Sequence, residues 1–267
     1  MKIPAFIFCL FLFLSLSGQE SSTSVIPLPN AHAHNDYEHT RPLLDALAQG
    51  FTSIEVDVFL IDDEIYVYHD LPEQVNPKRT LQKMYLDPLL ELSRQNGGKV
   101  YPKHDILFYL MIDIKKDGRL VYEKLKAIFK DYQEMLTSYS GTTTTRRAIT
   151  VFLSGDRPRQ QIFQEEERWM ALDGRPTDIG RFIDPSYMPV ISDNYNNHFK
   201  WKGETPEMPS EDWRKLRMMT ANAHGEGKKI RFWASPEKEV VWKALLRAQV
   251  DFINTDELVR FRQFVRK

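Results

Sequence analysis

Residues that could bind a metal ion or transfer protons gather near the start of this chain. The nine residues 31–39 contain five ionisable side chains, which are His32, His34, Asp36, Glu38 and His39. Further on, Glu55 and Asp57 stand two residues apart in an apolar run. Side chains two apart in a β-strand point to the same face, so both carboxylates would face the inside of a sheet or barrel. Because burying an unpaired carboxylate is costly, the pattern predicts a cation or a hydrogen-bond network there.

Two further pairs extend this set. His69 and Asp70 end an extended run, and Asp113 and Lys115 share a face at the end of the apolar run 106–115. Taken alone, His69-Asp70 is also typical of a turn, and Asp113 with Lys115 could form a buried ion pair. If the acids Glu55, Asp57 and Asp113 converge, they suit a hard cation, Ca²⁺ or Mg²⁺, better than zinc. Two histidines beside such a cation could act as base and acid.

Eight candidate strands could bring these residues together. They lie near residues 29, 52, 106, 148, 169, 188, 229 and 250, and helical patterns at 41–49, 81–94, 120–136, 209–226, 236–249 and 256–265 separate most of them. A helix break is expected at residues 87–88 and a low-complexity loop at 142–145. Apolar strands alternating with helices favour a parallel α/β fold, most simply a single-domain (β/α)8 TIM barrel. A doubly wound open sheet is the competitor, but no glycine-rich nucleotide loop follows a strand.

The candidate site residues follow the carboxyl ends of the expected strands, which is where barrel enzymes keep their chemistry. Trp233, near the end of the seventh strand, is either part of the core or a wall of a pocket there. The polar and aromatic segment 193–201, after the sixth strand, is a candidate for substrate selectivity.

Charge and composition limit the class of ligand. The 267 residues include 36 basic and 37 acidic side chains, a net charge of −1, which gives no electrostatic reason to expect nucleic acid or an anionic membrane as partner. Hydrophobic residues make up 42% of the chain, enough for a sizeable core. The sequence does not indicate an oligomeric state.

The first residues read as a secretory signal. Lys2 precedes an apolar run to Leu16, and small residues follow, so residues 1–18 are predicted to be a signal peptide and 19–29 a linker before a domain at 30–267. A membrane anchor is the alternative, but the run is shorter than the ~20 residues that a spanning helix needs. The single cysteine, Cys9, lies in this run, so an exported chain would contain no disulfide. We expect a secreted or periplasmic protein.

The order of these motifs resembles the superfamily of glycerophosphodiester phosphodiesterases and phosphatidylinositol-specific phospholipases C. The matching pieces run from residue 30 to residue 258, and they are His34-Asn35-Asp36, Glu38-His39-Thr40, Glu55-Val56-Asp57-Val58, His69-Asp70, Asp113-Ile114-Lys115, Arg231-Phe232-Trp233 and the segment 250–256. His-Asn-Asp-Tyr is closer to a branch that includes proteins resembling altered inheritance of mitochondria protein 6.

The resemblance implies roles for individual residues. Glu55, Asp57 and Asp113 would bind the cation, His34 and His69 would transfer protons, and Lys115 would steady the phosphate. Asn35 and Trp233 would contact substrate, while His32, Asp36 and Asp70 would support those groups from behind. The implied activity is metal-dependent hydrolysis of a glycerophosphodiester or a phospholipid-type head group.

Three positions depart from the superfamily's pattern. Asn35 replaces the usual phosphate-binding arginine, Asp36 replaces a glycine, and the third acid is Asp113 where many relatives have glutamate. Phosphodiester chemistry is therefore expected, and the substrate alcohol is left open.

Other functions remain open at this stage. His32-x-His34 also resembles the start of metal sites in amidohydrolases and histidinol phosphatases, in which His32 would be a ligand. A barrel that binds ligands without catalysis is a second alternative, and a metal-independent lyase is a third, although three carboxylates argue against a site without metal.

Overall fold

The computed structural model describes residues 25–267, and its centre is a closed barrel of eight parallel strands. The predicted signal peptide and residues 19–24 of the predicted linker lie outside the described residues. The barrel strands are β1 (Leu28–Ala33), β2 (Phe51–Ile61), β4 (Phe108–Ile114), β7 (Ile149–Gly155), β9 (Met170–Gly174), β10 (Val190–Asn194), β11 (Lys229–Trp233) and β12 (Phe252–Thr255). All eight predicted strands are present, and the predicted (β/α)8 barrel is confirmed.

The ring closes through β1. This strand pairs in parallel with β12 on one side and with β2 on the other, for example His32 with Asn254 and with Ser53. The remaining strands follow in the order β11, β10, β9, β7 and β4 back to β2. A doubly wound sheet would have two open edges, so closure at β1 excludes that competitor. Strand β3 (Glu64–Val67) lies antiparallel to the end of β2.

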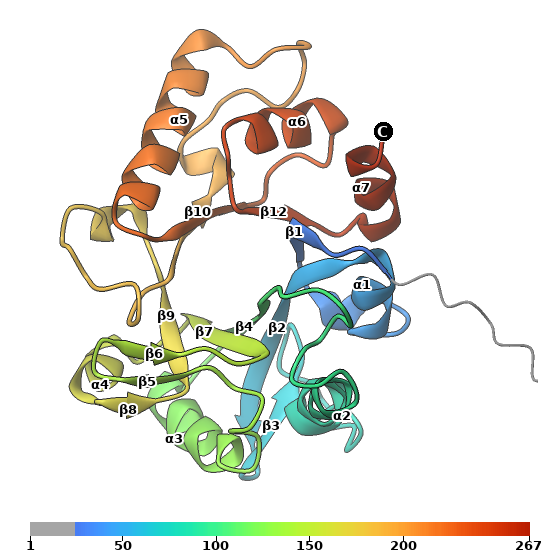
Figure 1. Cartoon of the computed structure of the whole chain (residues 1–267), viewed down its shortest axis with the longest axis vertical. Helices are drawn as coiled ribbons and strands as arrows, with labels where there is room; N and C mark the ends of the chain where they lie inside the picture. The colour runs from blue at the N-terminus through green and yellow to red at the C-terminus, as the bar shows by residue number, and fades with distance from the viewer. Residues whose placement is uncertain (1–24) are drawn as a thin grey trace, which may run out of the picture.

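Helices surround the ring (Figure 1). Helices α5 (Ser210–Gly225), α6 (Glu239–Arg247) and α7 (Leu258–Val265) cover one side, while α2 (Asp87–Gln95) and α3 (Gly118–Phe129) lie on the opposite side. The shorter segments are α1 (Leu44–Gln49), α4 (Arg159–Gln164), the π-helical turn η2 (Gln82–Leu86) and the 3₁₀ turns η1 (Asp36–Glu38), η3 (Pro176–Asp178) and η4 (Tyr195–Asn197). Among the described helices none combines the length and the apolar content needed to span a membrane.

Two local predictions were wrong. The helix expected to reach residue 136 ends at Phe129, because Leu136 instead forms a parallel bridge with Ile149. The threonine run is not a loop, since β6 (Thr143–Thr145) forms a small sheet with β5 (Ser138–Ser140) and β8 (Glu167–Arg168). The break predicted at residues 87–88 corresponds to a change of helix type, because the π-helical turn η2 ends at Leu86 and α2 begins at Asp87, with Pro88 in its first turn.

Alternation along the strands separates two sets of buried side chains. On β4, Leu110 and Ile112 belong to the main core between the strands and the helices, whereas Met111 belongs to a smaller cluster with Phe152 and Phe252. Inward-facing and outward-facing residues alternate in a barrel, so the smaller cluster fills its interior. Above this apolar layer, the inward-facing positions become polar, and they form the site described next.

Candidate functional site

A cavity of about 420 Å³ opens at the carboxyl ends of the barrel strands. We call it the site cavity. It is lined by seven of the predicted residues, which are His34, Asn35, Glu55, His69, Asp113, Lys115 and Trp233. Met111, Ser154, Arg175 and Arg231 complete the lining. The strands therefore bring into one cavity residues that are separated by up to 199 positions in the sequence.

Three carboxylates meet at this cavity. Glu55, Asp57 and Asp113 each offer an oxygen, and these oxygens lie within 4.8 Å of one another. Asp57 is 0% exposed, and its Oδ1 has no hydrogen-bond partner among the described residues. A buried carboxylate oxygen without a partner is costly, and three oxygen donors of one charge suit a hard divalent cation. The residues present therefore fit a Ca²⁺ or Mg²⁺ ion.

The raised pKa of Asp113 also favours a bound cation. Burial raises the pKa of Asp113 to about 6, and the nearby charges of Glu55 and Asp57 raise it as well, against the opposing charge of Lys115. Crowded acids of this kind resist ionisation unless positive charge is added. A bound cation would supply that charge and keep all three acids ionised.

Lys115 contributes a cationic group that contacts two of these acids. Its Nζ lies 2.6 Å from Asp57 Oδ2 and 3.3 Å from Asp113 Oδ1. Burial alone lowers the pKa of the lysine, but the bond to Asp57 and the charge of Asp113 outweigh it and raise the pKa above its usual value. Lys115 is therefore charged and held at the wall of the cavity.

Both predicted proton-transfer histidines have a carboxylate partner. His34 Nδ1 lies 2.8 Å from Asp256 Oδ1, and His69 Nδ1 lies 3.1 Å from Asp57 Oδ2. A carboxylate can only accept, so each Nδ1 donates its hydrogen and each Nε2 is left for another partner. Burial alone lowers the pKa of His34, but the bond to Asp256 and the charge of Glu55 raise it overall. Orientation by a carboxylate is typical of histidines that act as acids or bases.

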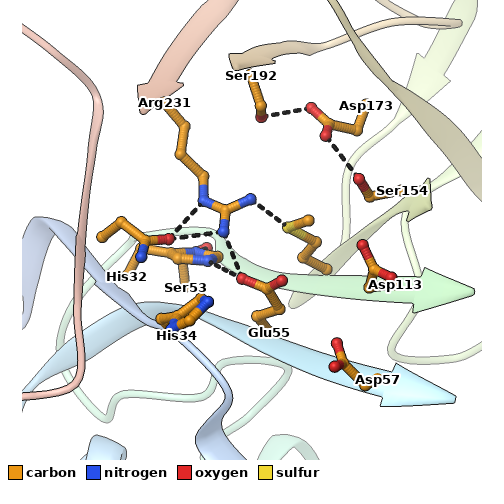
Figure 2. A network of polar contacts seen from close by, with 12 residues as sticks. His32, His34, Ser53, Glu55, Asp57, Asp113, Ser154, Asp173, Ser192 and Arg231 are labelled. Atoms are coloured by element: carbon orange, nitrogen blue, oxygen red, sulfur yellow. Dashed lines mark hydrogen bonds and ion pairs between the residues drawn. The ribbon is translucent and has the colours of Figure 1, made fainter. Parts of the chain in front are cut away.

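His32 lies behind Glu55 and not in the cavity lining (Figure 2). It is fully buried, with Nδ1 2.7 Å from Ser53 Oγ and Nε2 3.3 Å from Glu55 Oε2. Burial, followed by the charge of Arg231, lowers the pKa of His32 to about 3, so the ring is neutral. Its Nε2 then donates to Glu55 and its Nδ1 accepts from Ser53. Both nitrogens of His32 are therefore engaged by neighbouring side chains, and neither faces the cavity.

Arg231 is a site residue that the sequence reasoning did not assign. Its guanidinium is buried inside the barrel, where it pairs with Glu55 and donates from Nε to Asn254 Oδ1 at 2.9 Å (Figure 2). Burial alone would raise the pKa of Glu55, but Arg231 and His32 outweigh it and hold that pKa well below its usual range. The signal was available, because Arg231 and Trp233 are two apart on one strand and must share a face.

Arg175 is a second unassigned residue of the lining. It follows β9 and donates from Nη1 to Asp173 Oδ2 at 2.7 Å and from Nη2 to Ser154 Oγ at 3.3 Å. Its guanidinium carbon lies 5.1 Å from the centre of the Trp233 ring. No strand periodicity predicts the direction of a side chain just beyond a strand end, so sequence alone did not indicate this contact.

Two predicted supporting residues lie away from the cavity. Asp36 is fully buried, and its Oδ2 accepts from the Leu43 N–H at 2.5 Å and the Tyr85 hydroxyl at 2.9 Å. It therefore supports the segment after β1 from behind. Asp70 is exposed and is not part of the cavity lining, so the structure does not bring it to the site. Tyr37, which was not predicted, contacts one of the three clustered acids directly, since its hydroxyl donates to Asp57 Oδ2 at 2.6 Å.

Comparison with a solved structure agrees with the fold. The glycerophosphodiester phosphodiesterase from Agrobacterium tumefaciens superposes with a TM-score of 0.54 over 90% of this chain and 100% of its own, at 15% sequence identity. At that identity the likeness concerns the fold alone.

Sequence comparison identifies the family. An altered inheritance of mitochondria protein 6 homolog from Arthroderma benhamiae is 27% identical over 88% of this chain and 82% of its own length. Altered inheritance of mitochondria protein 6 from Eremothecium gossypii is 26% identical over 89% of this chain and 69% of its own. Residues 19–173, more than half of the chain, match the AIM6-like phosphodiesterase domain. The chain therefore belongs to the AIM6-like phosphodiesterase family, as its motifs predicted.

Proposed function

We propose that this protein is a metal-dependent phosphoric diester hydrolase that acts on a glycerophosphodiester or a phospholipid-type head group. The observation that carries the proposal is the meeting of three carboxylate oxygens within 4.8 Å, in a cavity that also contains His34, His69 and Lys115. Membership of a phosphodiesterase family supports the reaction class.

Glu55, Asp57 and Asp113 would hold a Ca²⁺ or Mg²⁺ ion. Glu55 Oε2 and Asp57 Oδ2 are engaged by neighbours, so each residue would offer its other oxygen. When bound, the cation supplies positive charge to a non-bridging oxygen of the phosphodiester.

The side chains around the acids carry the remaining steps. Lys115 places a second positive charge where negative charge accumulates on the phosphoryl oxygens in the transition state. Of His34 and His69, one takes a proton from the nucleophile, which is water or a hydroxyl of the substrate alcohol. The other gives a proton to the leaving oxygen. Asp256 and Asp57 hold the two rings in orientation through their Nδ1 atoms.

Two alternatives have less support. In a metallohydrolase of the amidohydrolase or histidinol phosphatase type, His32 would bind metal, but both of its nitrogens are engaged by Ser53 and Glu55. A barrel that only binds ligands would not need two histidines each oriented by a carboxylate. Both alternatives are outcomes of the following test.

The test is hydrolysis of bis(p-nitrophenyl) phosphate by protein that is first stripped with a chelator and then supplied with Ca²⁺ or Mg²⁺. We expect activity to disappear with the chelator, to return with a hard cation, and to fall by roughly a hundredfold or more in Glu55→Gln. Glu91→Gln, an exposed position on α2, is the matched control and should keep full activity. Activity that ignores the chelator would favour a lyase without metal. No activity with any cation would favour a binding barrel or the other type of metallohydrolase.

Export is part of the proposal. The apolar, cysteine-containing start of the chain supports a secreted or periplasmic protein without disulfides. Expression of the full-length chain followed by N-terminal sequencing of the exported form tests this, since we expect cleavage close to residue 18. An uncleaved protein held in the membrane fraction would contradict it.

A further inference from the structure

The wall of the site cavity opposite His34 contains an arginine and a tryptophan. In the order of the ring, β1 and β9 lie on opposite sides, so Arg175 at the end of β9 faces His34 at the end of β1 across the opening. Trp233 at the end of β11 lies two strands from Arg175. A phosphodiester held between the metal-site acids and Lys115 therefore extends its remaining part toward Arg175 and Trp233.

This wall offers nothing to a positively charged head group. A quaternary ammonium is recognised by an open aromatic face or a free carboxylate. The guanidinium carbons of Arg175 and Arg231 lie 5.1 and 6.0 Å from the centre of the Trp233 ring. Asp173, the acid of β9 on this side of the barrel, is fully buried and accepts from Arg175. It also accepts from Ser154 and Ser192 (Figure 2).

A second arginine lies beside the first without a carboxylate of its own. Strands β7 and β9 are paired neighbours, with Leu153 opposite Leu172, so Arg157 and Arg175 follow them at nearly the same level. Within residues 25–267, Arg157 forms no ion pair, its Nε is buried without a hydrogen-bond partner, and its Nη1 donates only to the Gly155 carbonyl at 3.2 Å. Burial, followed by the charge of Arg175, lowers the pKa of Arg157.

Positive charge is in excess in this region. The next arginine after Arg157 in the sequence, Arg159, is paired with Asp178 through two hydrogen bonds of 3.0 and 2.8 Å. Asp156 is turned to the start of α3, where it accepts from the Gly118 N–H at 2.9 Å. Asp173 neutralises Arg175, which leaves the charge of Arg157 without a counterpart. An anionic group on a ligand would supply both the missing charge and the missing acceptor.

We propose that Arg175, which lies against Trp233 in the lining of the site cavity, and Arg157, which follows the neighbouring strand just outside that lining, form a subsite for a second negatively charged group on the alcohol part of the phosphodiester substrate. The inference rests on the proposed function, because it describes how the same cavity selects among phosphodiesters. It assigns the substrate class as phosphodiesters whose alcohol carries a phosphomonoester or a similar anion, and it disfavours those with a quaternary ammonium.

The test compares two substrates that differ only in the second charge. Glycerophosphoinositol 4-phosphate and glycerophosphoinositol are hydrolysed in parallel by protein supplied with Ca²⁺ or Mg²⁺, and glycerophosphocholine is the cationic comparison. We expect kcat/KM to be about tenfold higher for the phosphorylated substrate than for glycerophosphoinositol, and lowest for the choline ester. Because both kcat/KM values are measured with the same protein preparation, their ratio does not depend on the fraction of protein that is folded.

Single substitutions show which arginines cause the preference for the phosphorylated substrate. Arg175→Gln and Arg157→Gln should each lower the ratio toward one, while the matched control Arg181→Gln, an exposed arginine after η3, should leave it unchanged. Arg157→Gln tests the substrate preference without a loss of stability, because Arg157 pairs with no carboxylate that the substitution would leave unpaired. A wild-type ratio of one or less, or a ratio that neither variant lowers, would overturn the subsite and leave the hydrolase intact. No turnover of any phosphodiester with any cation would instead remove the proposed function, and the subsite with it.

Discussion

The two ends of the barrel each contain a cavity, and their charged groups are arranged in opposite ways. At the amino ends of the strands, a cavity of about 370 Å³, the floor cavity, lies between the barrel and the β5-β6-β8 sheet. Its acid, Asp251, lies 3.1 Å from Lys229 Nζ and 2.7 Å from His224 Nε2, and it also accepts from the Ile230 N–H. At the carboxyl ends, three acids crowd together and Asp57 Oδ1 has no partner among the described residues.

The difference indicates which end carries function. In the floor cavity, the carboxylate of Asp251 is paired with two basic side chains, so its charge is neutralised within the fold. In the site cavity, the acids exceed what Lys115 and Arg231 can neutralise, so the folded chain keeps an electrostatic cost that a cation would relieve. Barrel enzymes keep chemistry at the carboxyl ends and structural residues at the amino ends, and this molecule follows that division.

The strongest test of this difference is to make the same substitution in the site cavity and in the floor cavity. Asp57→Asn removes a charge from the crowded acids, and we expect phosphodiesterase activity to fall by roughly a hundredfold or more because a metal ligand is lost. Asp251→Asn should leave activity within about twofold. Steady-state kinetics with bis(p-nitrophenyl) phosphate measures both, and equal losses in the two variants would contradict the assignment of the site.

Removing the proton-transfer group separates metal binding from catalysis. His34→Gln keeps a polar side chain beside Asp256, and we expect kcat to fall by about a hundredfold while cation affinity changes little. The matched variant His224→Gln, which contacts Asp251 in the floor cavity, should leave kcat unchanged. A His34→Gln enzyme with normal kcat would show that this histidine transfers no proton in the limiting step.

The free energy of unfolding should show the reverse order, with the larger loss in Asp251→Asn and the smaller loss in Asp57→Asn. Asp251→Asn weakens the bonds to Lys229 and His224, and we expect the free energy of unfolding to fall by about 1–2 kcal/mol. Asp57→Asn in metal-free protein relieves repulsion among the acids, so its cost should be smaller than that of Asp251→Asn. Urea unfolding without divalent cations measures the two values, and the reverse order would contradict the account of the crowded acids.

A buried acid behind the site gives an effect on stability that depends on pH. Burial raises the pKa of Asp36 to about 6, above its ordinary value of 3.8, so the folded chain holds this proton more tightly than the unfolded chain does. The stability contributed by Asp36 is therefore complete below pH 3.8 and is lost as the pH rises through about 6.

Asp36→Asn cannot ionise, so the difference in unfolding free energy between variant and wild type should shift in favour of the variant between pH 4 and pH 7. The shift should be on the order of 2 kcal/mol. Urea unfolding at the two pH values measures it, and a difference that is independent of pH would show that Asp36 is ionised without cost.

Strand periodicity explains most of what the sequence could predict. Glu55, Asp57, Asp113 and Trp233 lie on regular strands, where every second side chain faces inward, and all four converge as expected. The same rule applies to Arg231. Residues outside the strands follow no such period, which is why Asp70 was expected near the site and Arg175 was not.

The two histidines of the first motif show a further limit. His32 lies on β1 and His34 directly follows it, but His32 is enclosed by Ser53 and Glu55 while His34 reaches the cavity and Asp256. His32 contacts Ser53 on β2, which is 21 residues away in the sequence, and His34 contacts Asp256 just after β12, which is 222 residues away. Long-range partners of this kind decide whether a histidine is structural or catalytic.

The central claim is that the three acids bind a divalent cation, and calorimetric titration tests it most directly. Chelator-treated wild-type protein, Asp57→Asn and Asp251→Asn are each titrated with Ca²⁺ and with Mg²⁺. We predict saturable binding in the wild type and in Asp251→Asn, and at least about tenfold weaker binding in Asp57→Asn. Absence of binding in the wild type, or unchanged affinity in Asp57→Asn, would contradict the account.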